Sequence, residues 1–250
     1  MGTVRGISGL FTRGRVIVAV VVVVAAIAAG GTALALTPSA PSHVVSMSTA
    51  GQASAALKVT TGTPVLQVSV GKLGGTLLRV STPDDAPVRP VLSGSKLIVL
   101  SLTGAAHSGQ GSGYAVNVVL NSAVTWSLDL AGGTQRTVAD LRGGKVGGIA
   151  VTAGSDVLDV SLPKPAGTLP FLLAAGASQF LLSLPGGVPT QVTVGGGASF
   201  VSVDDQNLTG VAGGTVLTPP GWAAATSRFD IDATSGFSRL TVSRWYPAGS

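Results

Sequence analysis

The chain has 250 residues, of which 45% are hydrophobic and only 10% are charged. It contains 36 glycines but neither cysteine nor glutamate, which excludes disulfides and thiolate metal sites and disfavours a helix-rich body. The net charge of +5 is not gathered into a basic face, so nothing in the sequence points to nucleic-acid binding.

The N-terminal segment is predicted to carry a targeting signal. Residues 1–15 hold three arginines and are predicted to be a cytoplasmic basic tail, because positive residues stay on the inner side of a membrane segment. Residues 16–36 read VIVAVVVVVAAIAAGGTALAL, without a charge, and would span about 31 Å as a helix, close to the hydrocarbon thickness. We predict a single transmembrane helix (a signal anchor) over 16–36, with the remainder outside the cell. A cleaved signal peptide is the alternative, and it also exports the body.

Two further parts follow the membrane segment. Residues 37–56 are small, polar and proline-containing, which indicates a stalk. Residues 57–250 alternate strand-like runs with turn signals and are predicted to form one extracytoplasmic β-repeat domain. Within it, residues 81–90 and 104–113 are expected to be loops, because the first holds three prolines and the second is rich in glycine and serine.

A pattern recurs along the second half of the chain with a spacing of 21–22 residues. The segments IAVTAGSDVLDVSLP (149–163) and FLLAAGASQFLLSLP (171–185) show it, and each is centred on a glycine flanked by arms of period 2. The chain is expected to turn there at a backbone angle that a side chain would obstruct. The predicted turn glycines are Gly133, Gly154, Gly176, Gly197 and Gly236, and the predicted repeat core is Leu158, Phe180, Val201 and Leu240.

A fixed period of this length is typical of stacked supersecondary units. We therefore predict an all-β fold, a β-solenoid (β-helix-like) in which each unit buries its apolar positions against the next. A β-sandwich is the alternative, because sandwiches also have short strands with regularly spaced turns.

The repeats carry a resemblance to a known family. Together with WSLDLAGGTQRTVADL (126–141) and RFDIDATSGFSRLTV (228–242), they resemble the β-repeat domain of bacterial membrane-anchored "putative adhesin" or toastrack proteins. They are also similar to the C-terminal domain of LiaF-type cell-wall stress proteins, which differ in having several membrane segments. The resemblance covers roughly residues 110–245 and rests on spacing and glycine placement. It implies a role in adhesion, scaffolding or stress sensing, and it supplies no functional residues.

We find no enzyme signature, and we predict no catalytic, cofactor-binding or metal-binding residue. The two histidines, His43 and His107, fall in the predicted stalk and in a predicted loop. Tryptophans 126, 222 and 245 could form a sugar-stacking surface if exposed, but covering the ends of the solenoid is the favoured interpretation.

The carboxylate pairs are Asp84-Asp85, Asp204-Asp205 and Asp230/Asp232. Adjacent residues of a strand point to opposite faces, so the first two cannot act as acid–base pairs, and Asp204-Asp205 is expected to lie in a turn. Asp230 and Asp232 share a face, but two carboxylates are too few for Ca²⁺, which takes about six to eight oxygens.

The sequence thus predicts a non-enzymatic, membrane-anchored envelope protein that acts as a binding, adhesion or scaffold module. Its expected partners are the membrane and an envelope protein or wall polymer, with no cofactor and no nucleic acid. One alternative is a glycan-binding or wall-active enzyme domain, and another is an accessory sensor in envelope-stress signalling. Exposed Asp and Trp gathered in a groove would favour the glycan alternative, whereas aspartates scattered at turns would favour the binding module.

Overall fold

The computed structural model describes residues 42–104 and 113–247, and this part of the chain consists of 19 strands and their connections. The predicted tail, the predicted membrane helix over 16–36 and His107 lie outside the described residues. Over 42–104 and 113–247 there is no helix that could cross a membrane. The described body is all-β, as predicted.

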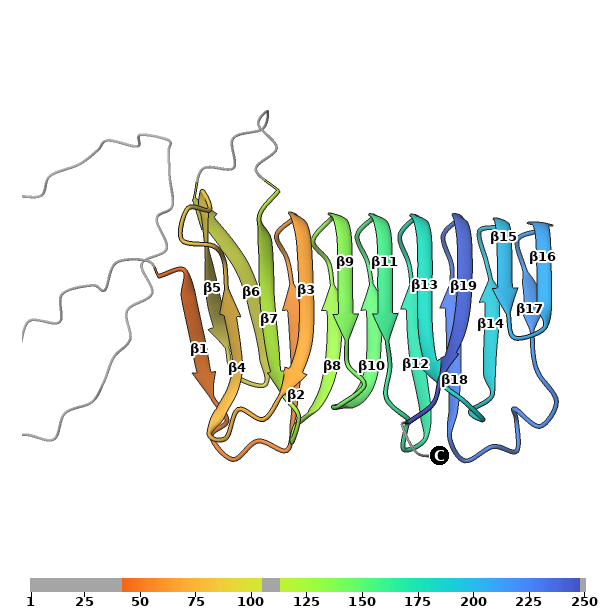
Figure 1. Cartoon of the computed structure of the whole chain (residues 1–250), viewed down its shortest axis with the longest axis horizontal. Coiled ribbons are helices and arrows are strands. Elements are labelled where there is room, and N and C mark those ends of the chain that lie inside the picture. Colours follow the sequence, from red (N-terminus) through yellow and green to blue (C-terminus); the bar gives the residue numbers. More distant parts are fainter. Residues whose placement is uncertain (1–41, 105–112, 248–250) are drawn as a thin grey trace, which may run out of the picture. The chain divides into compact units, whose positions relative to one another are not determined.

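The strands form two large mixed sheets that share one apolar core (Figure 1). The ten-stranded sheet contains, in spatial order, β1 (Val44–Ser48), β4 (Thr76–Ser81), β7 (Ala115–Asn121), β3 (Thr63–Gly71), β9 (Thr134–Asp140), β11 (Ser155–Ser161), β13 (Ala177–Pro185), β19 (Phe237–Trp245), β15 (Ala198–Val203) and β16 (Gln206–Val211). The nine-stranded sheet contains β17 (Thr215–Leu217), β14 (Thr190–Val194), β18 (Arg228–Ala233), β12 (Thr168–Leu173), β10 (Lys145–Val151), β8 (Thr125–Leu130), β2 (Ser54–Val59), β6 (Leu97–Gly104) and β5 (Val88–Gly94).

Most of the chain alternates between the two sheets in short coils. We use coil for one strand of the nine-stranded sheet, a bend at a glycine, and the following strand, which joins the ten-stranded sheet. The coil around Gly154 is β10 with β11, and the coil around Gly176 is β12 with β13. Corresponding strands of neighbouring coils pair in parallel, whereas the pairs at both ends of each sheet are antiparallel.

The repeat positions coincide in space. Leu158 pairs with Phe180, Phe180 with Leu240, and Leu240 with Val201. All four side chains are fully buried. The Phe180 ring also reaches the opposite sheet, where its centroid lies 5.1 Å from that of Phe171. One inward row of apolar side chains therefore runs across the coils, as the alternation of each arm requires.

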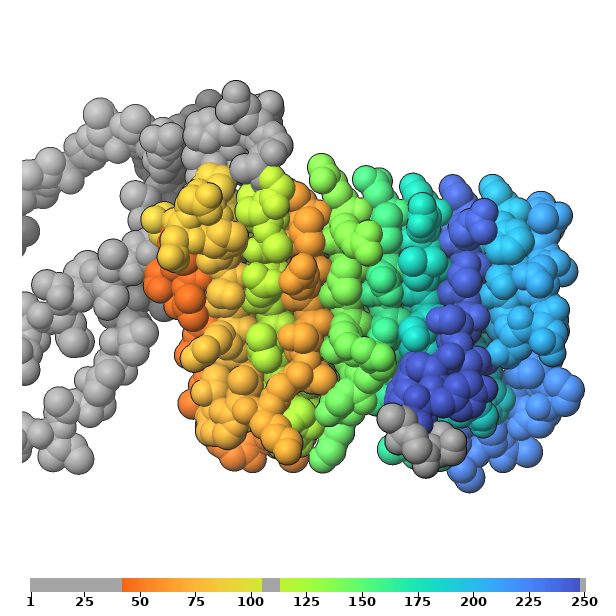
Figure 2. Space-filling view, viewed as in Figure 1, coloured from red at the N-terminus to blue at the C-terminus, as the bar shows by residue number. Residues whose placement is uncertain are grey.

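The spatial order of the coils differs from their order along the chain. The coil around Gly236 (β18 with β19) lies between the coils around Gly176 and Gly197. Figure 2 shows it as a dark-blue band between turquoise and lighter blue ones. The expectation that each unit stacks on the next is wrong here. All these coils carry the same apolar register. The coil around Gly236, which is last in the chain, can therefore pack between two coils that precede it in the sequence.

One coil was not predicted. β2 and β3 form a coil around Gly62, which pairs with the coil around Gly133 through β8 and β9. Leu57 and Leu66 stand five residues before and four residues after this glycine, as in the other units, and both are buried. The repeat is hard to recognise in the sequence because the strands β4 to β7 separate this coil from its spatial neighbour.

The predicted stalk over 37–56 contains part of the body. Residues 44–48 form β1, which pairs antiparallel with β4, and β2 begins at Ser54. Val45 and Met47 are half-buried and pack against the core. The boundary expected at residue 57 is too late, because a five-residue edge strand rich in serine has too little pattern to be separated from a polar linker.

Substitutions on the two faces of β13 test the observed register. Phe180→Asp should lower the free energy of unfolding by about 4 kcal/mol or more, because it removes a buried ring and places a charge in the core. Gln179 is exposed and pairs with Arg239, so Gln179→Asp should change stability by about 0.5 kcal/mol at most. Chemical denaturation of the two variants measures both values, and equal losses would contradict the register.

Candidate functional site

The turn glycines form a column where the coils pass from one sheet to the other. The residue after a glycine donates its N–H to the glycine carbonyl of the neighbouring coil. The bonds are Thr63 to Gly133, Thr134 to Gly154, Ser155 to Gly176 and Phe237 to Gly197, with N···O distances of 3.0, 3.1, 3.2 and 3.2 Å. The hydrogen bonding of the sheets therefore continues through the bends, where exposed backbone would otherwise need water.

The reason for glycine in this column differs from the one expected. Of the five predicted turn glycines, only Gly197 has a left-handed backbone, with a φ of 85°. A Cβ on Gly154 or Gly176 would lie 3.6 or 3.5 Å from the carbonyl oxygen of the next glycine, which is an ordinary contact. The unusual-angle explanation is wrong for Gly133, Gly154, Gly176 and Gly236.

The tight approaches lie one residue earlier, in two of the coils. A Cβ on Gly132 would overlap the carbonyl oxygen of Thr61 in the neighbouring coil. A Cβ on Gly196 would overlap the backbone nitrogen of Gly236. Close packing of backbone on backbone therefore requires glycine at these two positions.

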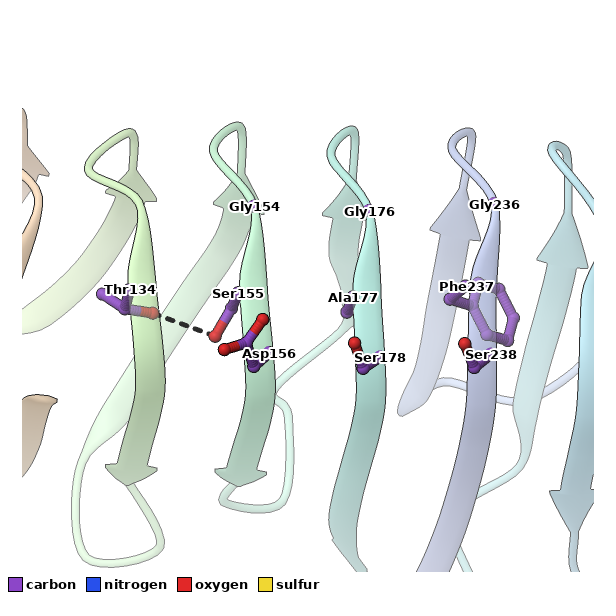
Figure 3. Close-up of a pocket in the computed structure, with 10 residues that line it drawn as sticks. All are labelled: Thr134, Gly154, Ser155, Asp156, Gly176, Ala177, Ser178, Gly236, Phe237 and Ser238. Carbon is purple, nitrogen blue, oxygen red and sulfur yellow. Dashed lines mark hydrogen bonds between the residues drawn. The ribbon is translucent and has the colours of Figure 1, made fainter. Parts of the chain in front are cut away.

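A shallow hollow of about 480 Å³ lies beside the glycine column and crosses four neighbouring coils (Figure 3). The backbone at Gly154, Gly176 and Gly236 lies along it. Two residues after each of these glycines, an exposed polar side chain lines the hollow: Asp156, Ser178 and Ser238.

The residues just before these polar groups turn inward. Ser155, Ala177 and Phe237 are buried. The Ser155 hydroxyl donates to the carbonyl of Val157 and accepts a bond of 2.9 Å from the Thr134 hydroxyl, shown in Figure 3. The hydroxyls of Thr134 and Ser155 are thus hydrogen-bonded within the protein. Asp156, Ser178 and Ser238, which we call the outer row, face solvent.

The outer row defines what this surface can do chemically. Neighbouring strands lie about 4.8 Å apart, so Asp156, Ser178 and Ser238 present hydrogen-bonding groups at that spacing across the sheet. An extended ligand lying across the strands could contact all three. In residues 42–104 and 113–247, no three His or Asp side chains are grouped so as to hold a metal ion.

The aspartates singled out in the sequence are dispersed over the body. Asp84-Asp85 is exposed in the connection between β4 and β5, and Asp204-Asp205 forms the turn between β15 and β16, as expected. Asp230 and Asp232 alternate with buried residues on β18 and face outward. His43 is hydrogen-bonded to the Thr82 hydroxyl at 2.9 Å. The structure does not bring these groups together.

Two aspartates are held in the ionised form by arginines. Arg244 donates from Nε and Nη2 to the two carboxylate oxygens of Asp204 at 2.7 and 2.8 Å, and these hydrogen bonds lower the pKa of Asp204. Arg142 contacts Asp140 in the same way at 2.9 and 2.7 Å and lowers the pKa of Asp140. A general acid working near neutral pH needs a raised pKa, so neither carboxyl suits that role.

The tryptophans do not form an exposed surface. Trp126 is fully buried and the other two are half-buried. Each indole N–H donates to a backbone carbonyl: Trp126 to Asn121 at 3.1 Å, Trp222 to Phe229 at 2.8 Å and Trp245 to Leu162 at 3.1 Å. For Trp126 the expected end-covering role is wrong, because β8 lies in the middle of its sheet and the ring fills the core.

Comparison with known proteins gives a fold likeness. No family model matches the chain, and no curated protein matches it significantly. The crystal structure of a protein described as a "putative cell adhesion protein" from Clostridium sporogenes ATCC 15579 aligns with a TM-score of 0.58 and 16% identity, over 81% of this chain and 100% of that one. One of a "putative adhesin" from Bacteroides fragilis NCTC 9343 aligns over 81% and 98% at 8% identity, but its TM-score of 0.21 supports no argument. The first match shows a shared fold.

Alanine substitutions in the glycine column separate the two kinds of position. Gly196→Ala should destabilise the body by about 1–3 kcal/mol, because its methyl group would overlap backbone atoms of the neighbouring coil. Gly154→Ala should be neutral or stabilise by up to about 1 kcal/mol, because its φ is ordinary and the unfolded chain loses freedom. Thermal melting of both variants tests this, and a greater loss for Gly154→Ala would contradict the account of the column.

Proposed function

We propose that the chain is a non-enzymatic binding and adhesion module of the cell envelope. In this proposal a single helix over residues 16–36 holds it in the membrane, and the parallel coils form a solenoid-like scaffold outside the cell. The hollow beside the glycine column carries the proposal, because neighbouring coils present Asp156, Ser178 and Ser238 at one register position. The fold shared with a protein described as a cell adhesion protein supports the same function.

The geometry of the hollow favours binding over catalysis. Asp156, Ser178 and Ser238 are exposed, and the floor includes the backbone of Gly154 and Gly176, whose carbonyls accept hydrogen bonds from the neighbouring coil. Electrostatic stabilisation of a transition state is strongest where water is excluded, and this surface is open to water. An extended envelope component, protein or polymer, could instead be retained by contacts repeated from coil to coil. No observation on the described residues favours the stress-sensor alternative related to LiaF-type proteins.

The membrane anchor gives the first arm of the test. The full chain, produced in bacterial cells, should stay with the membrane fraction through carbonate extraction, because about 20 apolar residues suffice to span a bilayer. Protease added outside intact cells should remove the body. Recovery of a soluble chain that begins between residues 36 and 41 would show instead that the segment is cleaved.

The hollow gives the second arm. In membrane fractions carrying the full chain, Ser238→Arg should weaken retention of isolated cell-wall and surface-protein fractions by about tenfold, which corresponds to ~1.4 kcal/mol. A long charged side chain would stand in the hollow, whereas Asn207→Arg places the same side chain on exposed β16 and should leave retention unchanged. Equal retention by both variants would contradict the role of the hollow, and hydrolysis of the retained material would contradict a non-enzymatic function.

A further inference from the structure

A second hollow lies at the other turns of the C-terminal coils. Figure 1 places the turn before β14, the turn between β15 and β16, the end of β19 and the connection before β18 at the same end of the coils. A hollow of about 370 Å³ opens among these segments, and we call it the Tyr246 site. It is lined by Gly187, Val188, Pro189, Asp204, Pro220, Gly221, Arg244 and Tyr246. Its volume falls in the range of about 300–1,000 Å³ that is usual for small-molecule sites.

The Arg244–Asp204 pair forms the polar wall of this site. Besides its two bonds to Asp204, the guanidinium donates from Nη1 to the carbonyl of Val188 and to the hydroxyl of Thr190, both at 3.1 Å. Four of the five N–H groups of the guanidinium are thus engaged, and one is left to donate to a ligand. The Arg244 side chain is 16% exposed and that of Asp204 is 42% exposed, so a rigid cation holds a carboxylate out toward the hollow.

The backbone at Asp204 is also unusual. Its φ is 51°, one of two left-handed non-glycine residues in the described part of the chain. In two-residue connections between antiparallel strands, glycine, asparagine and aspartate are the residues that accept a positive φ. Asp204 meets this preference, and its carboxylate is bonded to Arg244.

Tyr246 provides an aromatic surface next to the pair. Its ring packs against the backbone of Gly186, where a Cβ would overlap ring atoms. The N–H of Gly186 donates to the carbonyl of Trp245 at 2.9 Å, which fixes this end of β19 on the turn before β14. Tyr246 is nevertheless 69% exposed. The ring is therefore held in place while most of it faces solvent.

The charges of the site indicate the class of ligand. Among the described residues that line the site, Asp204 and Arg244 are the only ionised ones, and they neutralise each other, so this lining attracts neither anions nor cations strongly. The pair still offers carboxylate acceptors and an N–H donor, which form stronger hydrogen bonds than neutral groups. An aromatic face beside such groups suits a ligand with an apolar face and a hydroxylated edge. A pyranose ring has this chemistry.

We propose that the Tyr246 site binds a neutral pyranose unit of a polysaccharide, with the sugar ring against Tyr246 and its hydroxyls on Asp204 and Arg244. A smaller hollow of about 190 Å³ shares Asp204 and Pro220 with the site and also has Asp205 and Gln206 in its wall, so it can take the adjoining unit. This inference rests on the proposed binding function and names a ligand class for it.

The test uses the full chain in detergent micelles and titration calorimetry with three neutral probes: cellohexaose, mannohexaose and penta-N-acetylchitopentaose. At least one should bind, and Tyr246→Ala should weaken that binding about tenfold or more. Tyr246→Phe should retain it, because the ring remains. Arg239→Ala is the matched control, since Arg239 is an exposed cation that covers an aromatic ring on another part of the body. The Arg239→Ala chain should bind the probe with the same affinity as the unaltered chain.

Binding that is unchanged by Tyr246→Ala, with melting curves showing both proteins folded, would overturn the proposal. So would failure of all three probes, or tighter binding of the anionic polygalacturonate or of the cation choline. If the calorimetric test fails but membrane fractions still retain envelope material through the hollow at Ser238, only the sugar-binding proposal is contradicted and the proposed function stands. Loss of that retention as well would contradict both.

Discussion

The described body depends on one constraint, which is that a coil can bury its apolar row only against a neighbour in the same register. Leu158, Phe180, Leu240 and Val201 meet the constraint from four different coils, and each is fully buried. Because side chains alternate with period 2, a slip of one residue would place each of them in solvent. The same register brings the glycine carbonyls into line and sets the spacing of the polar row beside them.

Much of the fold follows from this pattern in the sequence. The spacing of 21–22 residues, the arms of period 2 and the inward positions all have counterparts in the structure. Two features do not follow from it. Coils that share a register are interchangeable in packing, so the pattern does not reveal that β19 lies between β13 and β15. The coil at Gly62 is separated from its neighbour by other strands, so no fixed period marks it.

The candidate sites were less predictable than the fold. The hollow beside the glycine column joins residues from coils that are not consecutive, since Ser178 and Ser238 are neighbours only because of the strand order. The Tyr246 site needs three connections and the end of β19 at one end of the coils, and its key pair, Arg244 with Asp204, is 40 residues apart in the chain. The polar row beside the glycine column occupies one repeat position, but only the strand order shows which coils are neighbours, whereas the Tyr246 site is built from turns that differ between coils.

These features are consistent with the proposed function. In that proposal the in-register polar groups would give repeated weak contacts that add up to retention, and the Tyr246 site would give one selective contact. Both hollows depend on the strand order, because the strand order decides which side chains are neighbours.

Disulfide trapping tests that order most directly. The chain has no cysteine, so only engineered pairs can form a bond. Residues 179 and 239 lie opposite each other on adjacent strands, within the Cα distance of about 4.4–6.8 Å that a disulfide accepts. Residues 179 and 200 are two strands apart, about 9.6 Å, which is too far. The account predicts that Gln179→Cys with Arg239→Cys forms an intramolecular disulfide in the folded chain and that Gln179→Cys with Phe200→Cys does not. A disulfide between 179 and 200, with none between 179 and 239, would show stacking in sequence order and would contradict the account.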